Sequence, residues 1–144
     1  MTTLGDAFVK TTIAVTNLER AKKFYGNTLG LREIESPMEE GDALYQCGHG
    51  AQVYLYERPD PSGSTATVCS FEVDNVEGAV KGLRNKGVTF EEYNMPNLKT
   101  ENGVATMGDL KAAWFKDPDG NILAVANSPV AHTAKTAQSA KARA

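Results

Sequence analysis

Histidine and cysteine, the side chains that most often bind metals or act as nucleophiles, are scarce in this chain. Its 144 residues include two histidines and two cysteines. His49 lies in a Gly-His-Gly turn and His132 near the C-terminal end, so they are not expected to converge. Cys47 and Cys69 have neither metal-binding nor redox spacing, and no histidine is placed to activate them. We predict that both are buried small residues in a reduced, cytoplasmic protein.

One short pattern occurs twice and defines the elements that must position any site. Residues 15–23 (VTNLERAKK) and 73–81 (VDNVEGAVK) carry Val, Asn, Glu, Ala and Lys at matching places. Each copy follows an alternating, β-branched run and opens an amphipathic helix that ends at a glycine. Asn17 is the predicted N-cap in the first copy, and Asn75 or Asp74 in the second. A protein built from two copies of one small unit commonly binds its ligand between them.

Alternation and turn residues predict a strand–helix–strand–strand–strand order in both copies. The first unit spans about 8–57, a Pro/Gly-rich linker covers 58–66, and the second unit spans about 67–127, which together make a single domain over 1–127. Strands are expected at 8–15, 31–35, 43–47, 52–57, 67–73, 88–92, 112–116 and 122–126, and helices at 18–28 and about 75–86. The connection 93–109 is unusually long, which indicates either a lid over a pocket or a surface decoration.

Composition and charge exclude several classes of function. A hydrophobic content of 41% suits one compact domain. The Ala/Ser/Thr/Lys-rich segment 128–144 is predicted to be a disordered tail, and without its three basic residues the net charge changes from −3 to 12 − 18 = −6. An acidic body without a basic stripe is not typical of nucleic-acid binding. The chain also lacks a secretion signal and any apolar run near the roughly 20 residues that cross a bilayer, so no membrane partner is expected.

Two motifs and the repeat resemble the vicinal oxygen chelate superfamily. The motifs are NLERAKKFY at 17–25 and FKDPDGNIL at 115–123. That superfamily includes glyoxalase I, extradiol dioxygenases, fosfomycin-resistance enzymes and bleomycin-resistance binding proteins. The resemblance covers about 8–127 and implies an α+β fold, in which two βαβββ units pair into curled mixed sheets around a concave cup, with helices on the convex side. It also implies a homodimer, and we interpret Asp117 and Asp119 of the second motif as turn residues.

The resemblance further implies where a divalent metal would bind. Two ligands are expected near the start of each unit's first strand, where this chain has Lys10 and Val68. Two more are expected in each unit's last strand, where it has Tyr54 and Ala124. Lysine is cationic, valine and alanine have no donor atom, and tyrosine is a rare ligand. Shifting the alignment by one residue assembles no better set, so we expect neither a metal nor another cofactor.

Strand alternation assigns side chains to the predicted cup. The inward-facing set from both units is Lys10, Thr12, Gln52, Tyr54, Tyr56, Ser70, Glu72, Trp114 and Ala124. The facing of Trp114 and Tyr45 depends on a register that the sequence leaves open, and we place Trp114 inward. Aromatic walls with a few polar groups suit a small molecule. The alternatives are that the two strand tyrosines fill a closed core and that Lys10 is an exposed strand-end lysine, without a role in anchoring an anion.

These observations predict a metal-independent small-molecule-binding protein of the glyoxalase/bleomycin-resistance fold, which sequesters an aromatic or antibiotic-like ligand. The alternative is a metal-free or atypical lyase, isomerase or oxygenase-like enzyme of the same superfamily. In that case Glu72, Lys10 or a tyrosine would transfer a proton, and Glu72 is the catalytic candidate because an inward carboxylate can act as a base. A third interpretation is a glyoxalase-type metal enzyme whose ligands lie elsewhere in the chain.

Overall fold

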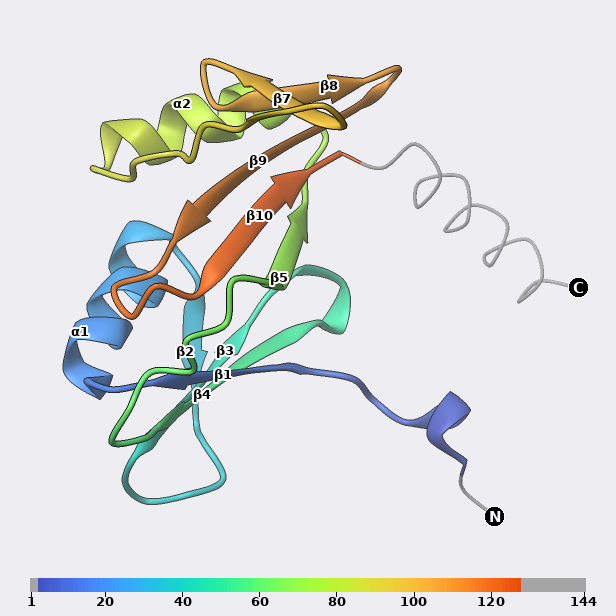
Figure 1. Cartoon of the computed structure of the whole chain (residues 1–144). Coiled ribbons are helices and arrows are strands. Elements are labelled where there is room, and N and C mark those ends of the chain that lie inside the picture. Colours follow the sequence, from blue (N-terminus) through green and yellow to red (C-terminus); the bar gives the residue numbers. More distant parts are fainter. Residues whose placement is uncertain (1–2, 128–144) are drawn as a thin grey trace, which may run out of the picture. The chain divides into compact units, whose positions relative to one another are not determined.

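A computed structural model describes residues 3–127 as two compact units (Figure 1). Of the described residues, the first unit contains those up to Val68 together with Asp117–Ile122, and the second contains Cys69–Lys116 and those from Leu123. The closing turn therefore groups with the first unit, although it belongs to the second repeat in sequence. The predicted tail and His132 lie outside the described residues.

The first unit is built on a four-stranded mixed sheet in the order β1-β4-β3-β2. Its strands are β1 (Thr11–Val15), β2 (Arg32–Ile34), β3 (Asp42–Gln46) and β4 (Gln52–Glu57). Strand β1 runs parallel to β4, while β3 is antiparallel to both β4 and β2. Helix α1 (Leu18–Lys22) continues into a π-helical turn, η2 (Lys23–Thr28), so the helix predicted at 18–28 is confirmed. Short 3-10 turns are η1 (Leu4–Asp6) and η3 (Gly48–Gly50).

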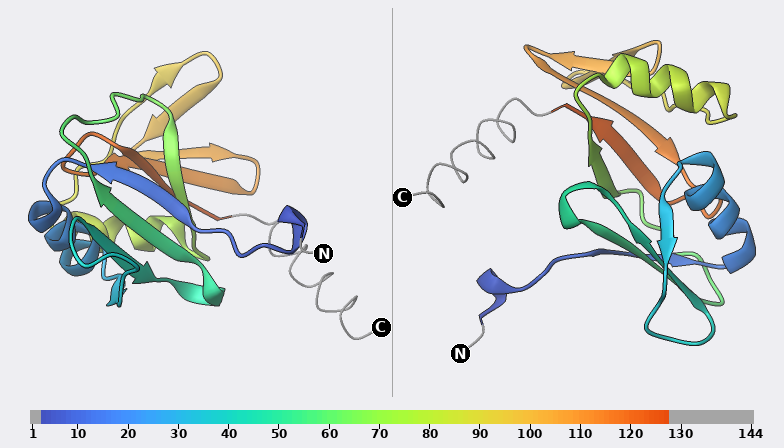
Figure 2. Two further views of the ribbon diagram at one scale, coloured as in Figure 1. Left: turned by 90° about the horizontal axis from the view of Figure 1, so that it is seen from below. Right: turned by 180° about the vertical axis from the view of Figure 1, so that it is seen from behind.

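The predicted first strand is shorter than its alternating pattern. Pairing with β4 starts only at Thr11, and the segment before it leads away from the sheet in both views of Figure 2. Consequently Phe8 and Val9 are exposed although they continue the pattern.

Asparagine side chains begin the main helix of each unit. The Oδ1 of Asn17 accepts a hydrogen bond from the Arg20 N–H, and that of Asn75 accepts one from the Gly78 N–H, both at 3.0 Å. The repeated asparagine is thus the N-cap in both copies, and Asp74 is not the cap. Such a cap satisfies an N–H that has no partner within the helix, which is worth about 1 kcal/mol.

One face of the first unit's sheet packs against α1 and η2. Alternate residues of three strands fill this face and are at most 3% exposed: Ile13, Val15, Tyr45, Val53 and Leu55. The Tyr45 ring lies 6.4 Å from that of Tyr25 in η2, which identifies this face as the helical side. Tyr45, whose facing the sequence left open, therefore points away from the predicted cup. The intervening residues of the strands form the opposite face.

The second unit has a six-stranded sheet in the order β5-β10-β9-β8-β7-β6, together with helix α2 (Val76–Asn85). Its strands are β5 (Thr67–Glu72), β6 (Asn94–Met95), β7 (Leu98–Glu101), β8 (Val104–Met107), β9 (Leu110–Lys116) and β10 (Ile122–Ala126). The predicted α+β class with two mixed sheets is confirmed. Among the described residues, no helix has the length and apolar character needed to cross a membrane.

The connection 93–109 was expected to be a loop, and that expectation is wrong. It forms β6, β7 and β8, which extend the sheet alongside α2 (Figure 1). A two-residue turn joins β7 to β8, because Asn102 and Gly103 adopt φ values of 53° and 81°. The Glu92 carboxylate accepts hydrogen bonds from the Gly103 N–H at 2.6 Å and the Thr100 hydroxyl at 2.7 Å. The strand predicted at 88–92 is reduced to one bridge between Phe90 and Phe115.

Candidate functional site

The sheet face of the first unit that points away from α1 gathers the candidate residues predicted in that unit. They are Lys10, Thr12, Gln52, Tyr54 and Tyr56. Register places Thr12 beside Tyr54, and Lys10 precedes Thr12 by two residues on the same side. Strand β3 adds Asp42, Leu44 and Gln46 to this face. They pair with Tyr56, Tyr54 and Gln52, in that order. Strand β2 extends the middle row with Ile34, which pairs with Leu44.

Tyr54 is the centre of this face because it contacts a charged side chain at each end. The Lys10 ammonium lies 4.6 Å from the centroid of its ring, a cation–π geometry. The Tyr54 hydroxyl donates a 2.8 Å hydrogen bond to Oδ2 of Asp42. We name Lys10, Asp42 and Tyr54 the Tyr54 cluster.

Asp42 is the buried member of the Tyr54 cluster, at 7% exposure. Its Oδ2 also accepts the Met38 N–H at 3.2 Å, whereas its Oδ1 is buried and has no hydrogen-bond partner among the described residues. Burial raises the pKa of Asp42, but polar groups of Ser36, Tyr54 and Met38 and the charge of Lys10 outweigh it, so the net pKa is lowered. Asp42 is therefore a carboxylate at neutral pH.

The hydrogen bond between Tyr54 and Asp42 shifts the pKa of Tyr54 in the opposite direction. The hydrogen bond to Asp42, followed by burial and the Asp42 charge, raises the pKa of the Tyr54 phenol. Tyr54 is therefore a neutral hydrogen-bond donor at neutral pH. The arrangement holds a phenol O–H and an ionised carboxylate in a fixed pair.

The amides at the other end of this face bind one another and the adjacent turn. Gln52 Nε2 donates to Gln46 Oε1 at 3.3 Å, and Gln46 Nε2 donates to the carbonyls of Cys47 and Ala51, both at 3.1 Å. These contacts fix the amides at the end of the β3–β4 hairpin. Cys69 is buried as predicted, whereas Cys47 is only partly buried, which differs from the prediction. Burial raises the pKa of the Cys47 thiol, which keeps it protonated.

The candidates in the second unit lie on three different strands. Ser70 and Glu72 of β5 are exposed, and Ala124 of β10 is buried. Trp114 of β9 contacts the Tyr93 ring edge-on at 5.6 Å. Its neighbour Phe115 packs on Phe90, over which the Arg84 guanidinium of α2 lies. Trp114 therefore occupies the sheet face opposite α2.

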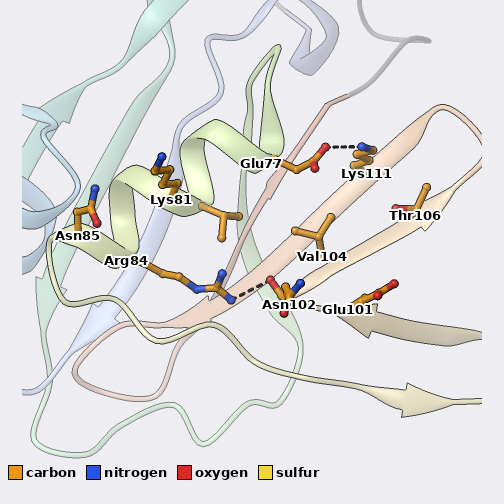
Figure 3. A pocket seen from close by; sticks show the side chains of 10 residues that line it. Glu77, Lys81, Arg84, Asn85, Glu101, Asn102, Val104, Thr106 and Lys111 are labelled. Carbon is orange, nitrogen blue, oxygen red and sulfur yellow. Dashed lines mark hydrogen bonds and ion pairs between the residues drawn. The ribbon is translucent and has the colours of Figure 1, made fainter.

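A groove of about 530 Å³ lies elsewhere in the second unit, between α2 and strands β7 to β9 (Figure 3). None of the predicted site residues lines it. Of its five charged side chains, Lys111 and Glu77 form an ion pair, and Arg84 donates to the Asn102 carbonyl at 2.8 Å.

The carboxylates of the closing turn are structural. Asp117 is 4% exposed, and its Oδ1 accepts the N–H groups of Asp119 and Asn121 at 2.9 Å, which confirms its interpretation as a turn residue. Asp119 has a further role that the sequence did not predict. It accepts from the Thr16 N–H at 3.1 Å and from Arg20 at 2.9 Å, and so holds the turn against the start of α1.

A divalent ion, which the family resemblance implies, does not fit the residues present. The described residues contain no group of three or more His, Cys, Asp or Glu side chains able to hold one. At the four implied positions, Lys10 is a cation, Tyr54 is a neutral phenol bound to Asp42, and Val68 and Ala124 offer no donor atom.

Sequence reasoning missed Asp42, the most distinctive residue of the site. The predicted strand began at residue 43, which left Asp42 in the preceding connection. The signal was the hairpin itself, since the turn at 48–50 sets a register that pairs Asp42 with Tyr56. Continuing the β3 pattern by one residue would have put a carboxylate on the face of the two tyrosines.

Comparison with known proteins supports the fold. A family model described as the Glyoxalase/Bleomycin resistance protein/Dioxygenase superfamily matches residues 7–125. None of the curated proteins compared with this sequence matches it significantly.

Solved structures with the same fold share little sequence with this chain. A glyoxalase family protein from Bacillus anthracis has a TM-score of 0.68 at 19% identity, covering 85% of this chain and 95% of its own. A member of the same superfamily from Sphaerobacter thermophilus has a TM-score of 0.62 at 28% identity, covering 85% and 98%. A lactoylglutathione lyase from Agrobacterium tumefaciens has a TM-score of 0.62 at 17% identity, covering 87% and 96%.

Proposed function

Because this chain belongs to the glyoxalase/bleomycin resistance protein/dioxygenase superfamily, we propose that it is a metal-independent small-molecule-binding protein. One observation carries the proposal: the Lys10 ammonium lies 4.6 Å from the Tyr54 ring, at the two first-unit positions where metal ligands are implied. An ammonium repels a divalent cation and donates hydrogen bonds only. The position therefore suits an anionic group of an organic ligand.

The surroundings of Lys10 support an organic ligand. The half-buried Tyr54, Tyr56 and Ile34 provide aromatic and aliphatic surface on one sheet face, beside the buried Leu44 and a small number of polar groups. Binding pockets for small molecules combine these two kinds of surface. Aromatic faces also favour flat ligands through stacking.

We also propose that the protein is a cytoplasmic homodimer. Its two cysteines have no disulfide-framework spacing in the sequence, which suits a reducing compartment, and proteins of this superfamily commonly dimerise. Light scattering is expected to give twice the 15.5 kDa chain mass at micromolar concentration. A monomer mass would contradict the assembly without affecting the binding proposal.

Metal retention tests the proposal directly. The purified protein is incubated with Mn, Fe, Ni and Zn salts, desalted, and analysed by elemental mass spectrometry. We expect retained metal far below one ion per chain, and a melting temperature that EDTA does not change. Near-stoichiometric retention of any of these ions would contradict metal-independent binding and would direct the work to glyoxalase and dioxygenase assays.

A metal-free enzyme is the second candidate, and the Tyr54–Asp42 hydrogen bond is the observation that favours it. A phenol paired with a carboxylate can transfer a proton to or from a bound substrate. If a compound that binds is also converted, Tyr54→Phe is expected to abolish turnover while leaving binding measurable. Glu72→Gln is the parallel test of the carboxylate predicted from sequence. Full activity in both variants would remove these two residues from any mechanism.

A further inference from the structure

We infer that the Tyr54 cluster recognises a zwitterion, namely a free α-amino acid with an aromatic or aliphatic side chain. The inference rests on the proposed binding function and names its ligand class. It starts from the charges at Tyr54, where Lys10 contacts the ring and Asp42 accepts from the hydroxyl.

The two charges of the cluster are not paired with each other. The Lys10 side chain is exposed and forms no ion pair or hydrogen bond among the described residues, so its ammonium is accessible to an anionic group. Asp42 is only 7% exposed, yet its Oδ1 has no hydrogen-bond partner within the described part of the chain. A buried acceptor without a donor is costly to the folded protein, and such atoms in native structures call for an explanation such as a missing ligand.

A zwitterion supplies what each charge lacks. Its carboxylate would pair with the Lys10 ammonium, and its ammonium would donate to Oδ1 of Asp42. Tyr54, Leu44 and Ile34 lie side by side on neighbouring strands, and the apolar side chain of the ligand would pack along them. A simple anion would leave Oδ1 of Asp42 without a donor, and a simple cation would form no ion pair with the exposed Lys10 ammonium.

Access to Asp42 requires Met38 to move. Its N–H donates to Asp42 Oδ2 at 3.2 Å, and its sulfur lies 3.6 Å from the Tyr54 hydroxyl, so Met38 lies at the edge of the cluster. The Met38 side chain is 56% exposed, which means that displacing it sacrifices little buried surface. Only the Met38 side chain needs to move, so its N–H would keep the hydrogen bond to Oδ2 while the ammonium of the ligand donates to Oδ1.

Three compounds that differ only in charged groups test the inference by titration calorimetry. They are phenylalanine (zwitterion), 3-phenylpropionate (anion) and 2-phenylethylamine (cation). We expect phenylalanine to bind at least about tenfold more tightly than either analogue, because each analogue loses one charged contact. Equal binding of phenylalanine and either analogue, or no binding of phenylalanine, would overturn the inference.

Charge-removing variants assign the two contacts. Lys10→Met is expected to weaken phenylalanine and 3-phenylpropionate alike, whereas Asp42→Asn should weaken phenylalanine and leave 3-phenylpropionate unchanged. The unchanged anion affinity also shows that Asp42→Asn remains folded at the site. Lys23→Met, on the exposed part of η2, is the control and should bind like the wild type. Loss of phenylalanine affinity in Lys23→Met equal to that in Lys10→Met would overturn the assignment.

The outcomes separate this inference from the proposed function. If 3-phenylpropionate binds as tightly as phenylalanine and depends on Lys10 alone, the zwitterion is wrong while metal-independent binding stands. If phenylalanine binds only after Zn²⁺ or Mn²⁺ is added, the proposed function is wrong as well.

Discussion

Two buried tyrosines in one core allow the same substitution, tyrosine to phenylalanine, to be tested with different expected effects on stability. Tyr25 and Tyr45 are both 0% exposed, and their rings lie 6.4 Å apart. The Tyr25 hydroxyl donates a 2.7 Å hydrogen bond to the buried Asp117 carboxylate. The Tyr45 hydroxyl is buried without a hydrogen-bond partner among the described residues.

The expected magnitudes follow from these contacts. A hydrogen bond to a charged group contributes about 1.5–3 kcal/mol to stability, so Tyr25→Phe is expected to lower the free energy of unfolding. The lower end, about 1.5 kcal/mol, applies because Asn121 Nδ2 still donates to the same Asp117 oxygen at 2.8 Å. Tyr45→Phe removes a hydroxyl that is desolvated without compensation. We expect the Tyr45 variant to match the wild type or to be more stable by about 1 kcal/mol.

Urea denaturation followed by circular dichroism measures both changes. Tyr93→Phe is the control, since the Tyr93 ring is half-buried and no hydrogen bond of its hydroxyl occurs among the described residues. Its stability should equal that of the wild type. A loss in Tyr45→Phe as large as that in Tyr25→Phe would refute the reasoning, because it would mean that the Tyr45 hydroxyl makes a stabilising contact.

Three further predictions concern pH and capping. Burial, assisted by the Glu33 charge, raises the pKa of Tyr45 from 10.0 to about 12, so the folded protein retains this proton more tightly than the unfolded chain. The Tyr45 phenol therefore does not change the free energy of unfolding below pH 10 and lowers it between pH 10 and 12. In urea denaturation at a series of pH values, Tyr45→Phe should reduce that fall by at most about 1.4 kcal/mol per pH unit. The pKa of Asp42 is lowered from 3.8, so its carboxylate stabilises the fold above that pH and the contribution disappears in acid. Melting curves of wild type and Asp42→Asn should accordingly change their separation only as the pH falls below about 4. Asn75→Ala should cost about 1 kcal/mol in urea denaturation through loss of the Gly78 N–H cap, while Asp74→Ala should cost nearly nothing.

The repeated helix motif was predictable because its physical cause is local. An asparagine followed by an amphipathic run caps a helix through contacts within three residues, and this holds for Asn17 and Asn75 alike. The glycines that end the helices act locally as well. Gly30 and Gly87 adopt φ values of 78° and 95°, which residues with a side chain rarely adopt.

The strands of the second unit depended on longer-range pairing and were predicted less well. Residues 88–92 have strand-forming composition, but they form only the Phe90–Phe115 bridge. Within 93–109, the pair Asn102-Gly103 was a local hairpin signal that the length of the connection obscured. The Tyr54 cluster is also non-local, because Asp42 reaches Tyr54 through the register between β3 and β4.

The first unit departs from a metal site in two independent ways, so restoring one residue is not expected to restore an ion. Lys10→His would remove the ammonium and supply one nitrogen donor. Tyr54 would still be a neutral phenol, because its hydrogen bond to Asp42 raises its pKa and keeps the proton on the hydroxyl. Metal analysis of Lys10→His should therefore match that of the wild type. A stoichiometric ion in this variant would show that Tyr54 is a competent ligand, and it would remove the main support for metal-independent binding.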